Sequence, residues 1–250
     1  MDVAIEFQTH ERVAAIVSSR LVQAGIPVIA LEVPHPGAVY FGANNYQAGQ
    51  MGGRAIARWA RKHWESEAEE IVLLKESQSG PLPKLRLTGM LHGLREELPA
   101  LERTPVTELD GKGLFAPAHD VIRRHVRRAP NRRTLVLAHN DLMALGAIRG
   151  FEEAGRGGQC GVVGQNAIPE AREELRRPGT PLIGTVAYFP EQYGDRVIPL
   201  ALALAAGKNP PAAQYTKHVL LTPGNVNEVY PVDLELPAGY QDHSVNPLSG

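Results

Sequence analysis

The sequence predicts an α/β fold in which mostly parallel strands alternate with helices. Three observations support this prediction: short apolar runs typical of buried strands, longer stretches with apolar residues at helical spacing, and a strand–helix–strand unit that ends by Leu31. Parallel strands need crossover connections, which are right-handed and usually helical. We therefore expect parallel sheets flanked by helices.

The expected strands are apolar runs bounded by polar or turn-forming residues. In chain order they cover residues 3–7, 26–31, 39–42, 71–74, 106–109, 135–138, 161–164, 182–187 and 217–221. The expected helices begin after capping or turn residues and cover residues 11–24, 47–63, 85–98, 118–128, 142–154, a stretch from 169 onward, and 191–206. Small residues in the second helix, including Gly49, Gly52 and Gly53, predict a face that packs closely against another element.

The stretch from residue 135 to residue 150 places polar side chains at the end of a buried strand. His139 and Asn140 follow the strand directly, and Asp141 can cap the next helix. Open α/β sheets bind ligands at the carboxyl ends of their strands, and Asn140 offers both a donor and an acceptor to a polar ligand. The alternative is that Asn140 serves only the turn.

Other polar residues are expected at the same edge of a sheet. Gln165 and Asn166 follow the strand at 161–164, and Arg86 stands where a polar loop meets a helix. A cation at a helix start opposes the helix macrodipole, which favours a role in contacting a hydroxyl-rich or anionic ligand. The alternative for Arg86 is a solvated surface arginine.

Composition restricts the function classes. The 250 residues carry a formal net charge of −1, 43% are hydrophobic, and Cys160 is the only cysteine, so no internal disulfide can form. An arginine cluster between Arg123 and Arg133 lacks interleaved aromatic residues, so we expect no nucleic-acid contacts. No Gly-x-Ser-x-Gly motif occurs and the nine histidines show no metal-ligand spacing, so we predict no enzyme, no metal and no cofactor.

Several segments in this order resemble one known family. They read GIPVIALE, YFGANNYQAGQMGGRAIA, RLTGMLHGLREE, LVLAHNDLMALGAIRGFEEAG, VVGQNAIPEA, GTVAYFPEQYG, LALAAGK and NVNEVYP. The chain resembles the type I periplasmic sugar-binding proteins of ABC transporters, of the ribose-binding kind, over nearly everything up to about residue 230. The same fold forms the effector domain of lactose-repressor-type regulators.

The resemblance implies two α/β lobes that close on a ligand in a cleft. One lobe would hold residues 1–43 and 189–216, the other residues 44–187 and 217–230, and residues 231–250 would form a tail. The family's opening strand–helix–strand–helix portion has no counterpart before Met1, so the first lobe is expected to be truncated at its N-terminus.

The resemblance also implies a set of ligand-binding residues: Glu32, Arg86, Asn140, Asn166 and Tyr188. Glu32 and Asn166 stand where ribose-binding members have aspartates, and Tyr188 stands where they have a glutamine, so ribose itself is not expected. For Tyr188 the alternative is a core residue. His35, between two prolines at the cleft rim, and His139 are additional candidates.

The function implied is non-catalytic binding of a sugar or similar polar small molecule, as the solute-binding component of an ABC transporter with a permease as partner. The alternative is the effector-binding domain of a regulator, which needs an upstream helix-turn-helix. We expect a monomer in the first case and a dimer in the second. A periplasmic or extracellular location is expected if the full-length protein carries a signal peptide, and no such signal is visible in this sequence.

Overall fold

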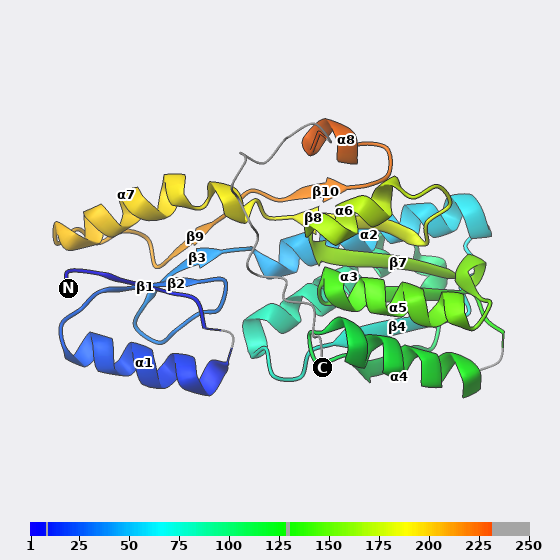
Figure 1. The fold of residues 1–250 in the computed structure, drawn as a ribbon, viewed down its shortest axis with the longest axis horizontal. Helices are drawn as coiled ribbons and strands as arrows, with labels where there is room; N and C mark the ends of the chain where they lie inside the picture. The colour runs from blue at the N-terminus through cyan, green and yellow to red at the C-terminus, as the bar shows by residue number, and fades with distance from the viewer. Residues whose placement is uncertain (9, 129–130, 232–250) are drawn as a thin grey trace, which may run out of the picture.

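A computed structural model describes residues 1–8, 10–128 and 131–231 and contains two sheets side by side (Figure 1). The smaller sheet has the order β1-β2-β3-β9, and all of its strand pairs are parallel. Its strands are β1 (Ala4–Glu6), β2 (Val28–Leu31), β3 (Val39–Gly42) and β9 (Ala213–Tyr215). Helices α1 (Glu11–Gln23) and α7 (Gly194–Ala205) lie on opposite sides of it.

The larger sheet has the order β10-β8-β7-β6-β4-β5. Its strands are β4 (Glu70–Lys75), β5 (Val106–Asp110), β6 (Thr134–Ala138), β7 (Cys160–Asn166), β8 (Leu182–Ala187) and β10 (Val219–Leu221). Its helices are α2 (Asn45–Trp64), α3 (Pro81–Glu97), α4 (Phe115–Arg128), α5 (Asp141–Glu153), α6 (Pro169–Arg176) and the short α8 (Val226–Val229). This arrangement confirms the predicted α/β class with parallel sheets flanked by helices.

The side chains of the central strands point alternately to the two faces of the larger sheet, and a hydrophobic core lies on each face. Val136 and Ala138 of β6 pack with residues of α4, α5 and α6, whereas Leu135 and Leu137 pack with residues of α2 and α3. Successive side chains of a strand point to opposite faces, so a strand buried on both faces is apolar throughout. The continuous apolar runs in the sequence have this origin.

Helices α2 and α3 approach each other so closely that a side chain would not fit at several glycines. A Cβ added at Gly53 would lie 2.0 Å from the Met90 carbonyl oxygen, and one at Gly49 would lie 2.2 Å from the Arg86 carbonyl oxygen. The close-packing face predicted for α2 is therefore confirmed. In the described part of the chain, no helix combines the length and apolar composition needed to cross a membrane.

The structure differs from the sequence prediction at several elements. Strand β10 pairs antiparallel with β8, and the three-residue strand β9 was not predicted because it contains no apolar run. Helix α3 begins at Pro81, four positions before the predicted start, because proline is well suited to the first turn of a helix. A 3-10 turn covers Pro190–Gln192, so α7 begins at Gly194 and not at residue 191 as predicted.

The chain passes between the two sheets at three segments, residues 43–44, 188–193 and 216–218. Hydrogen bonds join these segments to one another. The Asn44 amide donates to Nε2 of His218 at 3.1 Å, and the Thr216 hydroxyl donates to the Tyr188 carbonyl at 2.8 Å. The connections between the sheets therefore form one hydrogen-bonded group, and the carboxyl ends of β2, β4, β6 and β7 lie at the cleft between the sheets.

Candidate functional site

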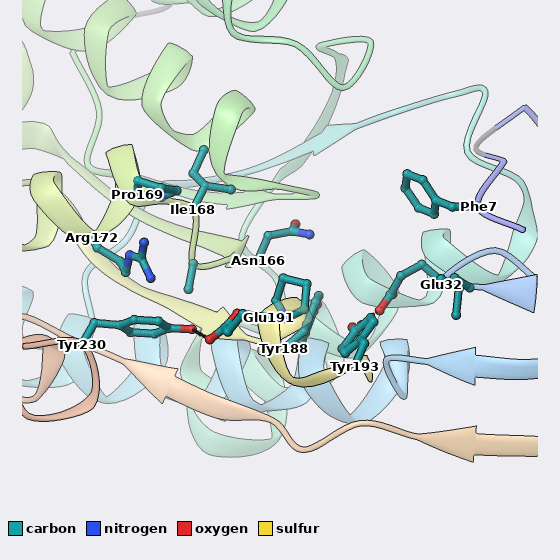
Figure 2. A pocket seen from close by; sticks show the side chains of 13 residues that line it. Phe7, Glu32, Asn166, Ile168, Pro169, Arg172, Tyr188, Glu191, Tyr193 and Tyr230 are labelled. Carbon is teal, nitrogen blue, oxygen red and sulfur yellow. Dashed lines mark hydrogen bonds between the residues drawn. The ribbon is translucent and has the colours of Figure 1, made fainter. Parts of the chain in front are cut away.

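The cleft between the two sheets contains two adjoining compartments. The first, which we call the polar compartment, measures about 280 Å³ and is defined by Glu32, Glu76, Arg86, His139, Asn140 and Asn166. The second, which we call the aromatic compartment, measures about 520 Å³ (Figure 2) and is defined by Ile168, Pro169, Arg172, Glu191, Tyr193 and Tyr230. Phe7, Glu32 and Asn166 line both compartments.

Glu32 follows β2 and lies between the two sheets. Its backbone has a φ of 59°, a left-handed conformation that turns the chain at the strand end. The carboxylate accepts a hydrogen bond from the Tyr193 hydroxyl and one from the Ala43 amide at 3.3 Å. Its Oε2 also lies 3.6 Å from Nη2 of Arg86, which belongs to the helices of the larger sheet. Glu32 thus connects the two sides of the cleft.

Arg86 is buried, with 6% of the surface of the whole residue exposed. Nε donates to Oδ1 of Asn45 at 2.6 Å, Nη1 donates to Oδ1 of Asn166 at 3.5 Å, and the guanidinium lies 5.1 Å from the centre of the Tyr188 ring. The alternative of a solvated arginine is therefore wrong. Because α3 begins at Pro81, Arg86 lies in the second turn, and the expected conflict with the helix dipole at the first turn is absent.

Asn140 caps α5 and also lines the polar compartment. Its Oδ1 accepts from the Met143 amide at 2.9 Å, and its Nδ2 donates to the Gly113 carbonyl at 3.0 Å. An amide has two donors and two lone pairs, so one of each is left after these bonds. Asn140 therefore serves the turn, and its remaining donor and lone pair are available to a ligand.

His139 lies beside Asn140 in the wall of the polar compartment and is 3% exposed. Nε2 lies 3.1 Å from the Pro83 carbonyl oxygen, and Nδ1 lies 3.3 Å from Oε2 of Glu76. Burial lowers the pKa of His139 and the nearby Arg86 charge acts in the same direction, whereas Glu76 opposes the shift. His139 therefore forms a buried part of the wall of the polar compartment, beside Glu76.

Asp141 fixes the loop that carries Asn166. Its carboxylate accepts from the Thr185 hydroxyl at 2.6 Å and from the Ile168 amide at 3.0 Å. Asn166 has a φ of 105°, a conformation that few residues other than glycine adopt without local support. Burial raises the pKa of Asp141 to about 7.

Tyr188 and His35 are less accessible than the other candidates. Tyr188 is 2% exposed, its hydroxyl bonds to Gln165, and its ring contacts Arg86 and His218, so little of it is left to reach the aromatic compartment that it lines. His35 is 5% exposed and lines neither compartment. Among the described residues, no hydrogen-bond partner reaches either ring nitrogen of His35.

Sequence reasoning missed several residues of the cleft. Glu76 follows β4 directly, as His139 follows β6, so the rule that selected His139 could also have selected Glu76. Arg172 lies on α6 and Tyr230 follows α8, and neither position ends a strand. The sequence offered no signal for these two side chains.

The structure offers little for metal or thiol chemistry. Within residues 1–8, 10–128 and 131–231, no group of three or more histidine, cysteine, aspartate or glutamate side chains is arranged to hold a metal ion. Cys160 is buried, and burial raises its pKa to about 12, which disfavours the reactive thiolate.

The fold and the site define a class of protein: a two-lobed α/β protein with a polar cleft between its lobes. A family model described as "Periplasmic binding protein domain" matches residues 3–209, and the chain belongs to this family. The type I fold predicted from the sequence is therefore confirmed, whereas the relation to lactose-repressor-type effector domains stays a prediction. A comparison with curated proteins found no match.

Solved structures of the same fold come from several bacteria. An ABC transporter periplasmic solute-binding protein from Actinobacillus succinogenes with bound D-allose has a TM-score of 0.77 at 20% identity, covering 91% of this chain and 80% of that one. A protein from Mycobacterium smegmatis in complex with β-D-fucofuranose has a TM-score of 0.78 at 21% identity, covering 93% and 76%. The Caulobacter myo-inositol binding protein bound to myo-inositol has a TM-score of 0.72 at 26% identity, covering 91% and 76%.

Proposed function

We propose that this chain is the non-catalytic, solute-binding component of an ABC transporter and that it binds a sugar or similar polar small molecule. The observation that carries the proposal is the polar compartment, where Glu32 on one side faces Arg86, Asn140 and Asn166 on the other. Carboxylate, guanidinium and amide groups suit the hydroxyl groups of a neutral ligand, because they offer several donors and acceptors in fixed planes.

The proposed mechanism is a hinge equilibrium. The lobes comprise residues 1–43 with 189–216 and residues 44–187 with 217–230, and the hinge comprises the three bonded crossing segments. A ligand that touches both lobes only in the closed form shifts the population toward that form by its difference in affinity. The permease then recognises and binds the closed form. The chain has no catalytic task in this cycle.

The similar solved structures support this proposal. D-allose, β-D-fucofuranose and myo-inositol, the ligands named for those proteins, are all small rings rich in hydroxyl groups. The polar compartment has groups that suit such ligands. We propose a monomer, and a periplasmic or extracellular location for a full-length form that carries a signal peptide.

Calorimetric titration of the chain with a panel of neutral sugars and cyclitols, beginning with D-allose and myo-inositol, tests the proposal. We expect binding by at least one of them, and weaker binding by the variant Asn166→Ala. Thr88→Ala, on the exposed face of α3, is the control variant. Absence of binding across the panel contradicts the proposal. A dimer that forms or dissociates with sugar favours the regulator's effector domain instead.

A further inference from the structure

The aromatic compartment extends the cleft well beyond the polar compartment. It measures about 520 Å³ against about 280 Å³, and the two meet at Phe7, Glu32 and Asn166. Ligand pockets typically measure about 300–1,000 Å³. The polar compartment alone is therefore sized for one small ring, whereas the joined cleft has room for a larger ligand.

Much of the wall of the aromatic compartment is apolar surface. Ile168 and Pro169 line one side, and the ring of Tyr193 lines another. Pro190 also lines the compartment. The Tyr193 hydroxyl is engaged with Glu32, so the ring remains as the available surface. Surfaces of this kind match the C–H face of a sugar ring or the face of an aromatic ring.

Tyr230 forms the end of the aromatic compartment opposite Glu32 and Phe7 (Figure 2). Three contacts hold Tyr230 in place. The guanidinium of Arg172 lies 4.0 Å from the centre of the Tyr230 ring, and the Tyr230 hydroxyl donates to Oε1 of Glu191 at 3.0 Å. The Tyr230 carbonyl accepts from Nη2 of Arg176 at 2.6 Å. A wall fixed in this way costs a ligand little additional ordering on binding.

We propose that the ligand is a glycoside, in which one sugar ring binds in the polar compartment and a second ring, joined by a glycosidic bond, binds in the aromatic compartment. The inference rests on the proposed sugar-binding function. The bond between the rings passes the junction formed by Phe7, Glu32 and Asn166. Arg172 and Glu191 provide the charged groups for polar substituents of the second ring, which is either a sugar or an aromatic aglycone.

Calorimetric comparison of one-ring and two-ring ligands tests this inference. Each monosaccharide in a panel is titrated beside disaccharides that contain it and beside its 4-nitrophenyl glycosides. We expect at least one two-ring ligand to bind tenfold or more tightly than its parent monosaccharide. Higher affinity for the disaccharides identifies the second ring as a sugar, and higher affinity for the 4-nitrophenyl glycosides identifies it as an aromatic aglycone. Monosaccharides that bind as tightly as all their two-ring derivatives overturn the inference but leave sugar binding intact. Binding by neither kind overturns both proposals.

A variant that fills the aromatic compartment provides an independent test. Ile168→Trp is expected to reduce the affinity for the two-ring ligand at least tenfold and to change the affinity for the monosaccharide less than twofold. Ile198→Trp, at an exposed position of α7 that does not line the cleft, is the matched control. Thermal unfolding checks that the variants fold, and Arg172→Ala replaces Ile168→Trp if that variant does not. Equal losses for both ligands, or no loss for either, overturn the inference.

Discussion

The carboxylate of Glu32 lies 3.6 Å from the guanidinium of Arg86, and this ion pair joins the two sides of the cleft. Both side chains are largely buried, with 17% and 8% of their surfaces exposed. Each has further partners on its own side, Tyr193 and Ala43 for Glu32 and Asn45 for Arg86. The groups assigned to the ligand are therefore already arranged across the cleft, which reduces the cost of ordering them on binding.

Replacing Glu32 by glutamine should weaken sugar binding. A hydrogen bond to a charged group contributes about 1.5–3 kcal/mol, so we expect Glu32→Gln to lower the affinity roughly 10- to 100-fold in calorimetric titration. Glu102→Gln, which affects an exposed pair with Arg95, should bind sugar as the wild type does. Unchanged affinity in Glu32→Gln would show that the carboxylate serves only the protein's own contacts.

Variants of Asn140 separate its role as a helix cap from its proposed role in binding. Asn140→Ser keeps a good capping residue, whereas Asn140→Ala removes the cap and should cost about 1 kcal/mol more in the free energy of unfolding. We expect both variants to lose sugar affinity about equally, because both remove the amide donor. Urea denaturation and calorimetry measure the two effects, and full affinity in Asn140→Ser would restrict Asn140 to the turn.

Asp141 should make stability depend on pH. Burial raises its pKa from 3.8 to about 7, so between these values the folded protein holds a proton that the unfolded chain releases. This contribution to stability is complete below pH 4 and is lost as the pH rises through 7. From pH 5 to pH 8 we expect the wild type to lose about 2–3 kcal/mol relative to Asp141→Asn in urea denaturation. Parallel pH profiles for the two proteins would contradict this assignment.

The contact between α2 and α3 should not tolerate a side chain at Gly53. Its Cβ would lie 2.0 Å from the Met90 carbonyl oxygen, which forces the helices apart. We expect Gly53→Ala to lower the free energy of unfolding by about 1–3 kcal/mol, the usual cost of overpacking. Gly158→Ala, where no atom lies within 4 Å of the added Cβ, is the control. Equal thermal midpoints for the two variants would contradict the prediction.

The sequence by itself determined the architecture, because buried parallel strands and their helices leave regular apolar patterns. It also determined that His139, Asn140 and Asn166 lie at one edge of the larger sheet, since each stands at or just beyond the carboxyl end of a strand. The same reasoning extends to Glu76.

Only the tertiary structure decided which of these groups face one another and which are already engaged. The burial of Arg86, the enclosure of Tyr188 and the separation of His35 from the cleft depend on contacts between distant segments. The aromatic compartment arises in the same way, since Ile168, Arg172, Glu191 and Tyr230 come from different elements. Local periodicity reports which face of an element is buried, but not which other element covers it.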